Sequence, residues 1–247
     1  MKISIITVCY NSAKTIEKTI LSVLGQSYNN IEYIIVDGNS KDTTVSIIKK
    51  HQNKISEWIS EPDKGLYDAM NKGVKMATGD LIGVLNSDDT FFSSTVIEEV
   101  FVFHSKNKID ASIGNIVQHK MNGSIIRLYS SKNWTTERLK IGYMPPHPSI
   151  FFKKELFHKL GYYDLGFKIG ADYEIITRFF LKNKIKWKYS GITTTAMLAG
   201  GLSSSGASSY KLITNEIQKA LTMNGISFSS YKIKMRFLWK IIGFFKK

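Results

Sequence analysis

The sequence predicts an α/β fold with a mostly parallel central sheet flanked by helices, and three observations support this prediction. Short apolar runs of strand length alternate with segments of helix length from the first residues onward. The apolar runs are nearly continuous, which is typical of strands buried on both faces of a parallel sheet. Polar residues follow the ends of several runs, where open α/β sheets bind ligands. This order favours right-handed crossover connections.

The beginning of the chain holds three predicted strands and two predicted helices. Ile16, Ile20, Val23 and Leu24 recur at helical spacing, so the segment between the first two apolar runs is a helix. The predicted strands are Ile3–Cys9, Ile31–Val36 and Ile55–Ile59, and the predicted helices are Thr15–Leu24 and Asp42–Lys50.

The most informative stretch is Pro62–Thr90. It contains a predicted helix, Leu66–Ala77, and a short apolar strand, Leu81–Leu85, that ends in the sequence Asn-Ser-Asp-Asp. Adjacent carboxylates at the carboxyl end of a buried strand repel one another unless a cation lies beside them. Mg²⁺ and Mn²⁺ prefer such oxygen ligands and often bridge to substrate phosphates. The alternative is that Asp88 and Asp89 only turn the chain and cap the next helix.

The remainder of the chain is less regular. Trp134–Met144 receives no assignment, and Asp164–Gly170 is predicted to be a loop. Gly200–Ser209 is rich in glycine and serine, which makes it a candidate lid. Predicted helices cover Thr95–Phe103, Lys154–Leu160 and Asp172–Lys182, and predicted strands cover Asp110–Ile116, Gly123–Tyr129 and Ser149–Phe152.

Composition limits the class of protein. The chain has 247 residues, 43% of them hydrophobic, so it can bury a substantial core. Cys9 is the single cysteine, which excludes a disulfide framework and makes a cysteine zinc site implausible. No secretory signal and no apolar run of membrane-spanning length is present in the sequence. By elimination we expect a cytoplasmic protein.

Polar side chains close the first, second and fourth predicted strands. These are Tyr10-Asn11, Asp37 and Asp88-Asp89, and a doubly wound sheet would gather them along one edge. The first strand is not followed by G-x-G-x-x-G, and the chain has no Walker lysine loop. A dinucleotide dehydrogenase and a P-loop enzyme are therefore disfavoured.

At this point the sequence resembles a known family, the inverting glycosyltransferases of family 2, which have the GT-A fold with a Rossmann-like sheet. Four motifs follow the family's order: ISIITV with Tyr10-Asn11, the segment Val36–Thr43, the stretch ending in Ser87-Asp88-Asp89, and Gly170–Glu174. The resemblance extends from residue 3 to about residue 190. The wording of Pro62–Gly73 is similar to transferases that build bacterial surface polysaccharides, such as colanic-acid and O-antigen transferases.

The resemblance implies roles for particular residues. Thr7, Tyr10 and Asp37 would hold the base and ribose of a nucleotide-sugar donor, with a lean toward UDP-sugars, because an aromatic ring stacks on a pyrimidine and a carboxylate accepts its ring N–H. Asn11, Asn71 and Lys72 are further donor-binding candidates. Asp89 would bind Mn²⁺ or Mg²⁺ directly, and Asp88 would contact the ribose or the metal's water. The alternatives are packing for Tyr10 and a turn role for Asp37 before Gly38.

Asp172 falls on the family's catalytic-base position, and a helix N-cap is its alternative role. We take His147, Glu174 and Ser203 as candidates for acceptor contacts; a structural hydrogen bond is the alternative for His147. Three departures from the family pattern stand out: Met70 replaces a frequent arginine, Asn86 a frequent third acid, and Ala171 a frequent acid before the base.

The formal net charge is +14, and half of this excess lies in the last 31 residues, which contain seven Lys or Arg and no Asp or Glu. From Tyr231 the chain reads YKIKMRFLWKIIGFFKK, with a basic stripe and a broad apolar and aromatic face on a helical wheel. This pattern suits a helix lying on an anionic membrane surface, here the inner face of the plasma membrane. Packing of the same face on the body or on a second subunit is the alternative.

The expected organisation is a GT-A domain over 1–210, with a nucleotide-binding half over 1–90 and an acceptor half over 91–210, and a basic membrane-association segment over 211–247. The acceptor would be a hydroxyl of a glycan, lipid-diphosphate-linked in the polysaccharide-building relatives. Two rival functions are a sugar nucleotidyltransferase and a basic nucleic-acid-binding protein. Basic residues in the body are mixed with acids and no nucleic-acid motif occurs, so we expect no nucleic-acid partner.

Overall fold

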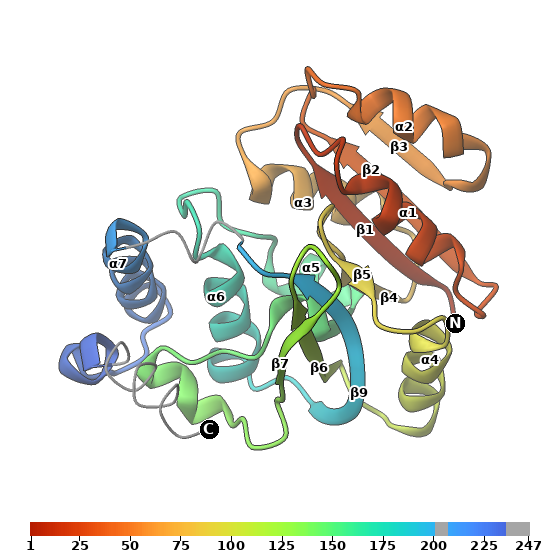
Figure 1. Cartoon of the computed structure of the whole chain (residues 1–247). Coiled ribbons are helices and arrows are strands. Elements are labelled where there is room, and N and C mark those ends of the chain that lie inside the picture. The colour runs from red at the N-terminus through yellow and green to blue at the C-terminus, as the bar shows by residue number, and fades with distance from the viewer. Residues whose placement is uncertain (201–206, 236–247) are drawn as a thin grey trace.

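The computed structural model describes residues 1–200 and 207–235 of the chain, and Figure 1 shows the arrangement of their helices and strands. The described strands form one mixed sheet in the order β3-β2-β1-β4-β8-β6-β9-β5, with β7 paired to β6. Helices pack on both faces of this sheet. The predicted α/β fold is therefore confirmed.

The first half of the sheet is parallel throughout. Strand β1 (Ile3–Cys9) lies in the middle and pairs with β2 (Ile31–Asp37) and β4 (Leu81–Val84), while β3 (Glu57–Ser60) pairs with β2. Every residue of β1 and β4 is buried, as the continuous apolar runs predict. The connecting helices are α1 (Ile16–Leu24), α2 (Thr44–His51), which continues into the 3₁₀ turn η1 (Gln52–Lys54), and α3 (Leu66–Met76).

The second half mixes strand directions. Strand β8 (Ile150–Lys153) runs antiparallel to both β4 and β6 (Ala111–His119), and so joins the two halves. Strand β9 (Trp187–Leu198) runs parallel to β6 and antiparallel to the short β5 (Thr90–Phe91). The β6–β7 hairpin, with β7 over Ile125–Tyr129, turns at Gly123, whose φ of 83° suits glycine.

The helices of the second half agree with most of the predicted ranges. These are α4 (Val96–Lys106), α5 (Lys154–Leu160) and α6 (Ala171–Ile176), and α6 continues as the π-helical turn η4 (Thr177–Lys182). The unassigned segment contains the 3₁₀ turn η2 (Thr136–Ile141), and the proline-rich segment ends in η3 (His147–Ser149). Strand β9 occupies a range in which the sequence pattern predicts no element.

Two apolar clusters cover the two faces of the sheet. One face packs against α1, α2 and α4, and the other against α3, α5, α6, η4 and α7 (Ala207–Met223). Aromatic rings fill the second cluster: Phe152 of β8 lies 5.4 to 5.9 Å from the ring centres of Phe157, Phe179 and Phe180. These rings fix α5, α6 and η4 on the sheet beside α3.

The C-terminal part modifies two sequence predictions. Helix α7 begins at Ala207, so the last residues of the predicted flexible segment Gly200–Ser209 are helical, while 201–206 lie outside the described residues. Ile233, in the first turn of the predicted amphipathic helix, is fully buried in the core, and the Tyr210 hydroxyl donates to the Lys234 carbonyl oxygen at 2.7 Å. Residues 236–247, with most of the basic stripe, lie outside the described part. Across the described residues, no helix is both long and apolar enough to cross a bilayer.

Candidate active site

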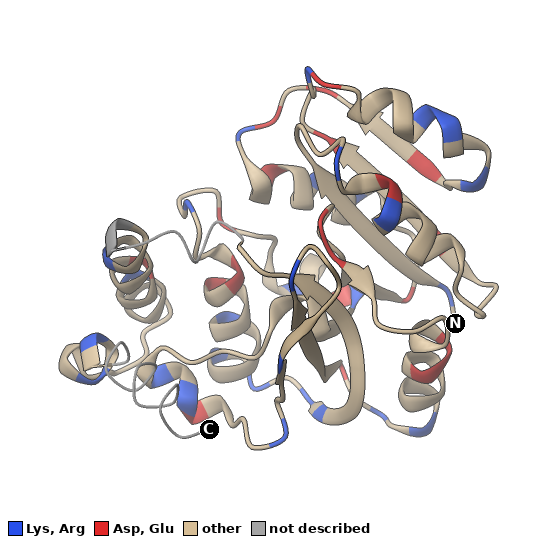
Figure 2. Ribbon diagram, in the orientation of Figure 1, with Lys and Arg blue, Asp and Glu red and all other residues tan. Residues whose placement is uncertain are grey.

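The carboxyl ends of β1, β2 and β4 meet at one edge of the sheet, which we call the donor edge. Cys9 at the end of β1 is in register with Asp37 at the end of β2, and Leu85 after β4 donates to the carbonyl oxygen of Ile6. Tyr10, Asp37 and the Asn86–Asp89 segment therefore share this edge, as predicted from strand order. Figure 2 shows acidic residues on the segment between β4 and β5 and at the start of α6.

Tyr10 presents an open aromatic face at the donor edge. Its side chain is 59% exposed, and Gly38 lies beside its ring. A β-carbon at Gly38 would lie 2.3 Å from the Asp63 Oδ2 atom and 3.5 Å from the Tyr10 ring, so a larger residue there would displace the Asp63 carboxylate. Asn11 follows with a φ of 50°, and its Oδ1 atom accepts a bond from the Lys41 N–H at 2.8 Å. This surface is suited to stacking of a nucleobase.

Asp37 and Thr7 are buried and already hydrogen-bonded. The Asp37 carboxylate accepts bonds from the Ser40 N–H (3.0 Å), the Ser40 hydroxyl (2.5 Å) and the Ser60 hydroxyl (2.7 Å). The Thr7 hydroxyl accepts one from the Tyr33 phenol at 3.2 Å. Asp37 thus lies at the donor edge with its oxygens engaged by its own chain, and Thr7 lies inside the sheet.

Asp88 and Asp89 form an acid pair without a cationic partner among the described residues. Asp89 is 1% exposed; its Oδ1 accepts the Leu198 N–H and its Oδ2 the Asn86 amide, both at 3.2 Å. Burial and the Asp88 charge raise the pKa of Asp89 to about 7, and burial also raises the pKa of Asp88. The buried Asn86 Oδ1 atom has no hydrogen-bond partner. The site therefore has three oxygen-bearing side chains and unbalanced negative charge.

Asp172 lies half-buried at the start of α6 and faces α3. Its Oδ1 accepts the Tyr173 N–H at 2.7 Å and a long bond from the Tyr67 hydroxyl at 3.4 Å. Burial raises the pKa of Asp172 to about 6. The Tyr173 bond agrees with the helix-capping alternative, yet the Asp172 carboxylate also has the elevated pKa expected of a general base.

Tyr163 connects the two halves around Asp172. Its backbone N–H and carbonyl oxygen both pair with the Asn71 side chain of α3, at 2.9 and 2.8 Å. Its ring stacks on Tyr67 at 5.9 Å, and its hydroxyl lies 2.8 Å from the His147 Nε2 atom. Burial lowers the pKa of His147 to about 4, so this histidine is neutral near pH 7. Asn71 and His147 therefore fasten Tyr163 in the described structure.

The remaining predicted residues have other partners. The Lys72 ammonium lies at the donor edge, 2.8 Å from Glu61 and 2.8 Å from the Pro62 carbonyl oxygen. Glu174 is 4% exposed, binds Arg178 through both carboxylate oxygens at 2.9 and 2.8 Å, and accepts a bond from Asn224. Ser203 lies outside the described residues.

Sequence reasoning missed several residues that shape the site. Tyr67 and Tyr163, which touch or support Asp172, lie in helix and loop segments where only the fold brings them together. The Asp63 carboxylate lies beside Gly38, and the Leu198 N–H reaches Asp89 from the unpredicted strand β9. No local pattern indicates these contacts, because each joins residues far apart in the chain.

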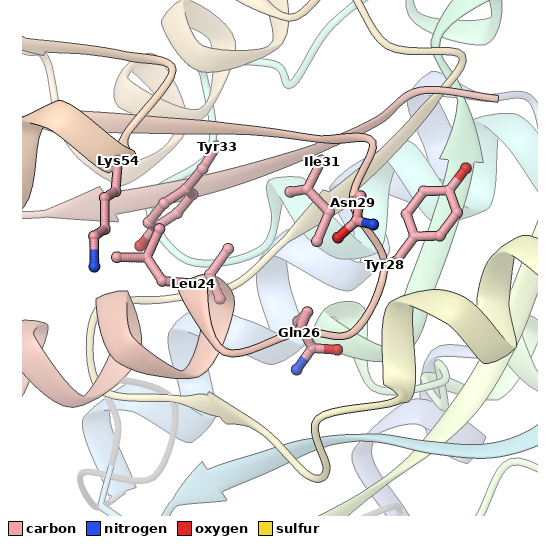
Figure 3. A pocket seen from close by; sticks show the side chains of 8 residues that line it. Leu24, Gln26, Tyr28, Asn29, Ile31, Tyr33 and Lys54 are labelled. Carbon is pink, nitrogen blue, oxygen red and sulfur yellow. The ribbon is translucent and has the colours of Figure 1, made fainter.

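A cavity of about 200 Å³ lies away from this site, between the end of α1 and the start of β2 (Figure 3). Ile31, which lines it, begins the strand that Asp37 ends. The cavity is therefore at the opposite end of the parallel strands and does not belong to the donor edge.

Within the described residues, no group of three or more His, Cys, Asp or Glu side chains is arranged to hold a metal ion. The two carboxylates of Asp88 and Asp89, together with the side-chain amide oxygen (Oδ1) of Asn86, nevertheless fit a hard divalent cation. Mg²⁺ and Mn²⁺ commonly take one or two carboxylates and complete their shell with water and substrate phosphates. The unpartnered Asn86 oxygen and the raised pKa of Asp89 both favour a cation here.

Comparison with solved structures gives the fold. Crystallised S. aureus TarS residues 1–349 in complex with UDP-GlcNAc is similar in fold, with a TM-score of 0.71, 20% identity, and coverage of 96% of this chain and 72% of that fragment. In another crystal structure of that fragment the chain spans 65% of its length. The mannosyltransferase PcManGT from Pyrobaculum calidifontis in complex with GDP-Man and Mn²⁺ has a TM-score of 0.67 at 15% identity, with 90% and 63% coverage. The chain has the GT-A glycosyltransferase fold of these proteins.

The sequence comparisons then give the family. The sequence model described as "Glycosyl transferase family 2" matches residues 4–169, well over half of the chain. An uncharacterized glycosyltransferase of Mycobacterium tuberculosis is 33% identical over 178 residues, covering 71% of this chain and 68% of the relative. A PGL/p-HBAD biosynthesis glycosyltransferase of Mycobacterium bovis is 27% identical over 229 residues, covering 90% and 84%. The chain belongs to glycosyl transferase family 2 and is a glycosyltransferase.

The raised pKa of Asp89 gives a prediction about stability without added metal. Since folding raises the pKa of Asp89 from its ordinary value of 3.8 to about 7, the folded state carries a cost that is absent below pH 4 and complete above pH 7. Asp89→Asn removes this cost and keeps one side-chain oxygen that can accept the Leu198 N–H. We expect the variant to exceed the wild type in unfolding free energy by on the order of 2 kcal/mol at pH 8, with the difference shrinking toward pH 4. Urea unfolding at several pH values in EDTA measures this; a difference independent of pH would contradict it.

Proposed function

We propose that this glycosyltransferase moves a sugar from a nucleotide-sugar donor to a hydroxyl of a glycan acceptor, with inversion at the anomeric carbon. The observation that carries the proposal is the position and pKa of Asp172, a half-buried carboxylate on the acceptor side of α3, held by Tyr67 and poised near pH 6. The fold neighbours crystallised with UDP-GlcNAc and GDP-Man support a nucleotide-sugar donor. Donor binding belongs to residues 1–90 and acceptor binding to residues 91–210 in this proposal.

The donor would lie along the donor edge. Tyr10 offers its ring to the base, and Asp37 offers a carboxylate held by the Ser40 N–H and by two serine hydroxyls that can turn toward a ligand. Thr7 and Asn11 frame this position, and Asp88 would contact the ribose. Lys72 reaches the diphosphate only if it leaves Glu61, while Asn71 supports the site through Tyr163. An exposed aromatic beside a buried carboxylate favours a uridine nucleotide.

Asp89, Asp88 and the Asn86 oxygen would hold Mn²⁺ or Mg²⁺. The bound cation would offset the negative charge that develops on the departing nucleoside diphosphate. Asp89 is the direct ligand in this proposal, because its carboxylate is the more deeply buried and the more strongly shifted of the pair. The PcManGT structure with Mn²⁺ supports metal use by a related fold.

The reaction follows from the placement of Asp172. In its ionised form Asp172 accepts the proton of the acceptor hydroxyl, whose oxygen forms a bond to the anomeric carbon as the bond to the diphosphate oxygen breaks. The long bond from the Tyr67 hydroxyl and the short one from the Tyr173 N–H use a single oxygen, Oδ1, which leaves Oδ2 for the proton. Burial of the site reduces competition from water.

The proposed acceptor is a lipid-diphosphate-linked glycan of bacterial surface polysaccharide, such as O-antigen, and the enzyme would act as a peripheral protein on the inner face of the plasma membrane. A relative named for PGL/p-HBAD biosynthesis supports a lipid-linked product. The last 31 residues supply seven basic side chains and no acid. We propose that segment 211–247 attaches the enzyme to anionic lipid through its last residues, while α7 and Ile233 pack on the body.

Asp172→Asn tests the base role. Asparagine can still accept both hydrogen bonds at Oδ1, so the fold and donor binding should persist while turnover falls on the order of 10²–10⁴-fold. Release of nucleoside diphosphate from UDP-GlcNAc and related donors, with acceptor glycolipid, measures turnover, and release of pyrophosphate instead would indicate a nucleotidyltransferase.

The wild-type rate should rise through about pH 6 as Asp172 deprotonates. Tyr67→Phe keeps the base but removes a bond that lowers its pKa, so this rise should move to higher pH. Near-normal turnover of Asp172→Asn would remove it from the base role.

Binding of Mn²⁺ alone tests the metal site without any assay of activity. A cation that binds only the folded form at about a hundredfold above its Kd adds about 2.7 kcal/mol to the unfolding free energy. We expect Mn²⁺ to stabilise the wild type more at pH 8 than at pH 5.5, since protonation of Asp89 competes with the ion. Asp89→Asn should abolish this effect and Asp88→Asn should weaken it, whereas the exposed Glu57→Gln at the far end of the sheet is the matched control. Equal stabilisation of Asp89→Asn would contradict the assignment.

Truncation after Met235 tests the membrane proposal while keeping the buried Ile233 in place. The full chain should cosediment with vesicles containing phosphatidylglycerol, less so at high salt, and should not bind neutral phosphatidylcholine vesicles. The truncated chain should remain in solution and keep its thermal stability. Undiminished sedimentation of the truncated chain would place lipid binding elsewhere on the molecule.

A further inference from the structure

A cavity of about 230 Å³ lies in the second half of the molecule, along the segment that follows β7 (green in Figure 1). Its walls come from the end of β7, the loop that leads into η2, and the residues just before Pro146. Asp37, Asp88, Asp89 and Asp172 are absent from its lining, so it is separate from the site of the reaction. It is smaller than the roughly 300–1,000 Å³ typical of pockets for drug-sized ligands, which suits a single ring.

One wall of the cavity is aromatic and rigid. The Trp134 indole packs edge-on against Trp187 and Phe180, at 5.1 and 5.8 Å between ring centres, and its Nε1–H donates to the Tyr143 carbonyl oxygen at 3.2 Å. Tyr129 and Tyr143 add two more aromatic side chains to the lining. Flat apolar surfaces of this kind fit the C–H face of a sugar ring, whose hydroxyls then point to the polar side of the pocket.

The polar side has a hydroxyl without a partner. Ser131 is one of the lining residues and is 2% exposed, and its buried Oγ atom makes no hydrogen bond in the described structure. The Ser131 backbone is fixed, because its N–H donates to the Asn115 Oδ1 atom at 3.0 Å and its carbonyl oxygen accepts the Trp134 N–H at 2.9 Å. Buried hydroxyls almost always have a partner, so this one is satisfied best by a ligand hydroxyl.

Arg138 adds a positive charge at the same cavity. Its side chain is exposed, and its guanidinium makes no ion pair or hydrogen bond with any described residue. The turn η2 that carries Arg138 is held by backbone hydrogen bonds. A guanidinium with free donors beside a small pocket binds carboxylate or phosphate groups in a two-pronged geometry. The cavity therefore combines the groups that recognise an acidic sugar.

Two sets of contacts connect the cavity to Asp172. The Tyr173 hydroxyl, adjacent to Asp172 in α6, donates to the Leu139 carbonyl oxygen next to Arg138. On the other side, the segment after Pro145 leads to His147, which binds Tyr163, and the Tyr163 ring stacks on Tyr67 beside Asp172. A ligand in the cavity is thus held by the same elements that hold the base.

We propose that this cavity is an acceptor subsite that binds a sugar residue of the glycan other than the one that reacts, and that Arg138 selects a sugar with an acidic substituent. This inference rests on the proposed function, because it names the acceptor of that transferase. Ser131 and the aromatic wall bind the ring, and Arg138 pairs with its carboxylate. The acceptor is then an oligosaccharide, since one residue fills the cavity while another presents its hydroxyl to Asp172.

Saturation-transfer NMR on the full chain tests the subsite directly. The probes are methyl glycosides of gluco, galacto and manno configuration, each compared with the matching methyl uronide, which differs only in the carboxylate at C6. We expect at least one pair to bind, with the uronide at least tenfold tighter than the neutral sugar. Arg138→Ala should remove this preference, and Ser131→Ala should weaken both members of the pair roughly fivefold.

The variants remove side-chain groups that have no partner, so the fold should be unaffected. Lys132→Ala, which removes a neighbouring exposed charge outside the cavity, is the matched control and should bind like the wild type. Binding by no probe, or binding that neither Ser131→Ala nor Arg138→Ala changes, would overturn the subsite. Equal binding of neutral and acidic sugars would overturn the role of Arg138.

Hydrolysis of the donor in the absence of acceptor separates this inference from the proposed function. Ser131→Ala and Arg138→Ala should release nucleoside diphosphate from the donor at the wild-type rate, because neither touches the donor edge. Probe binding at the cavity in a chain that consumes no nucleotide sugar would leave the sugar site standing and refute the transferase proposal. Consumption of the nucleotide sugar without binding of any probe would support the transferase proposal and refute the sugar subsite.

Discussion

The position of Asp172 depends on how Tyr163 is held against α3. The Asn71 side chain pairs with both backbone polar atoms of Tyr163 inside the protein. Because water does not reach these buried groups, losing the pairing would leave them without hydrogen bonds. The Tyr163 ring then supports Tyr67, and the Tyr67 hydroxyl reaches Asp172. Because α3 also packs on β1 and β2, the base is fixed relative to the donor edge through a single helix.

Hydrogen bonding separates structural acids from the candidate catalytic ones. Glu32 is partly buried, which raises its pKa, but bonds from Lys2, Ser4 and Thr78 outweigh burial and lower it to about 2. Glu174 is likewise engaged, by Arg178 and Asn224. No cation among residues 1–200 and 207–235 pairs with Asp89 or Asp172, and burial raises the pKa of each. A buried carboxylate with a raised pKa destabilises the folded protein when it is ionised. Such carboxylates are typical of sites that bind a metal ion or accept a proton.

The sequence predicts the donor edge better than the acceptor side, for a physical reason. Buried parallel strands have continuous apolar sequences, so the local pattern predicts β1, β2 and β4 and the acidic residues that follow them. Strand β9 does not: most of its residues are half-buried, and Gly191, with a φ of 77°, interrupts its alternation. Because β9 is not predicted, the hydrogen bond from the Leu198 N–H to Asp89 is not predicted either. Asn71 lies on a helix that the pattern predicts, yet its partner is 92 residues away, which no local signal reveals.

Asp89 belongs to both halves of the molecule. Its backbone carbonyl oxygen accepts the Thr19 hydroxyl of α1 at 2.7 Å, while its side chain accepts the Leu198 N–H at the end of β9. The acid is therefore fixed from the donor half and from the acceptor half at once, and a cation bound there would meet a carboxylate that need not reorganise. Preorganised charge of this kind stabilises a leaving group most effectively where water is excluded, which is also what raises the pKa of Asp89 in the absence of metal. The strain on the free carboxylate and its fitness for a cation thus have one cause, its burial between two elements that the sheet brings together.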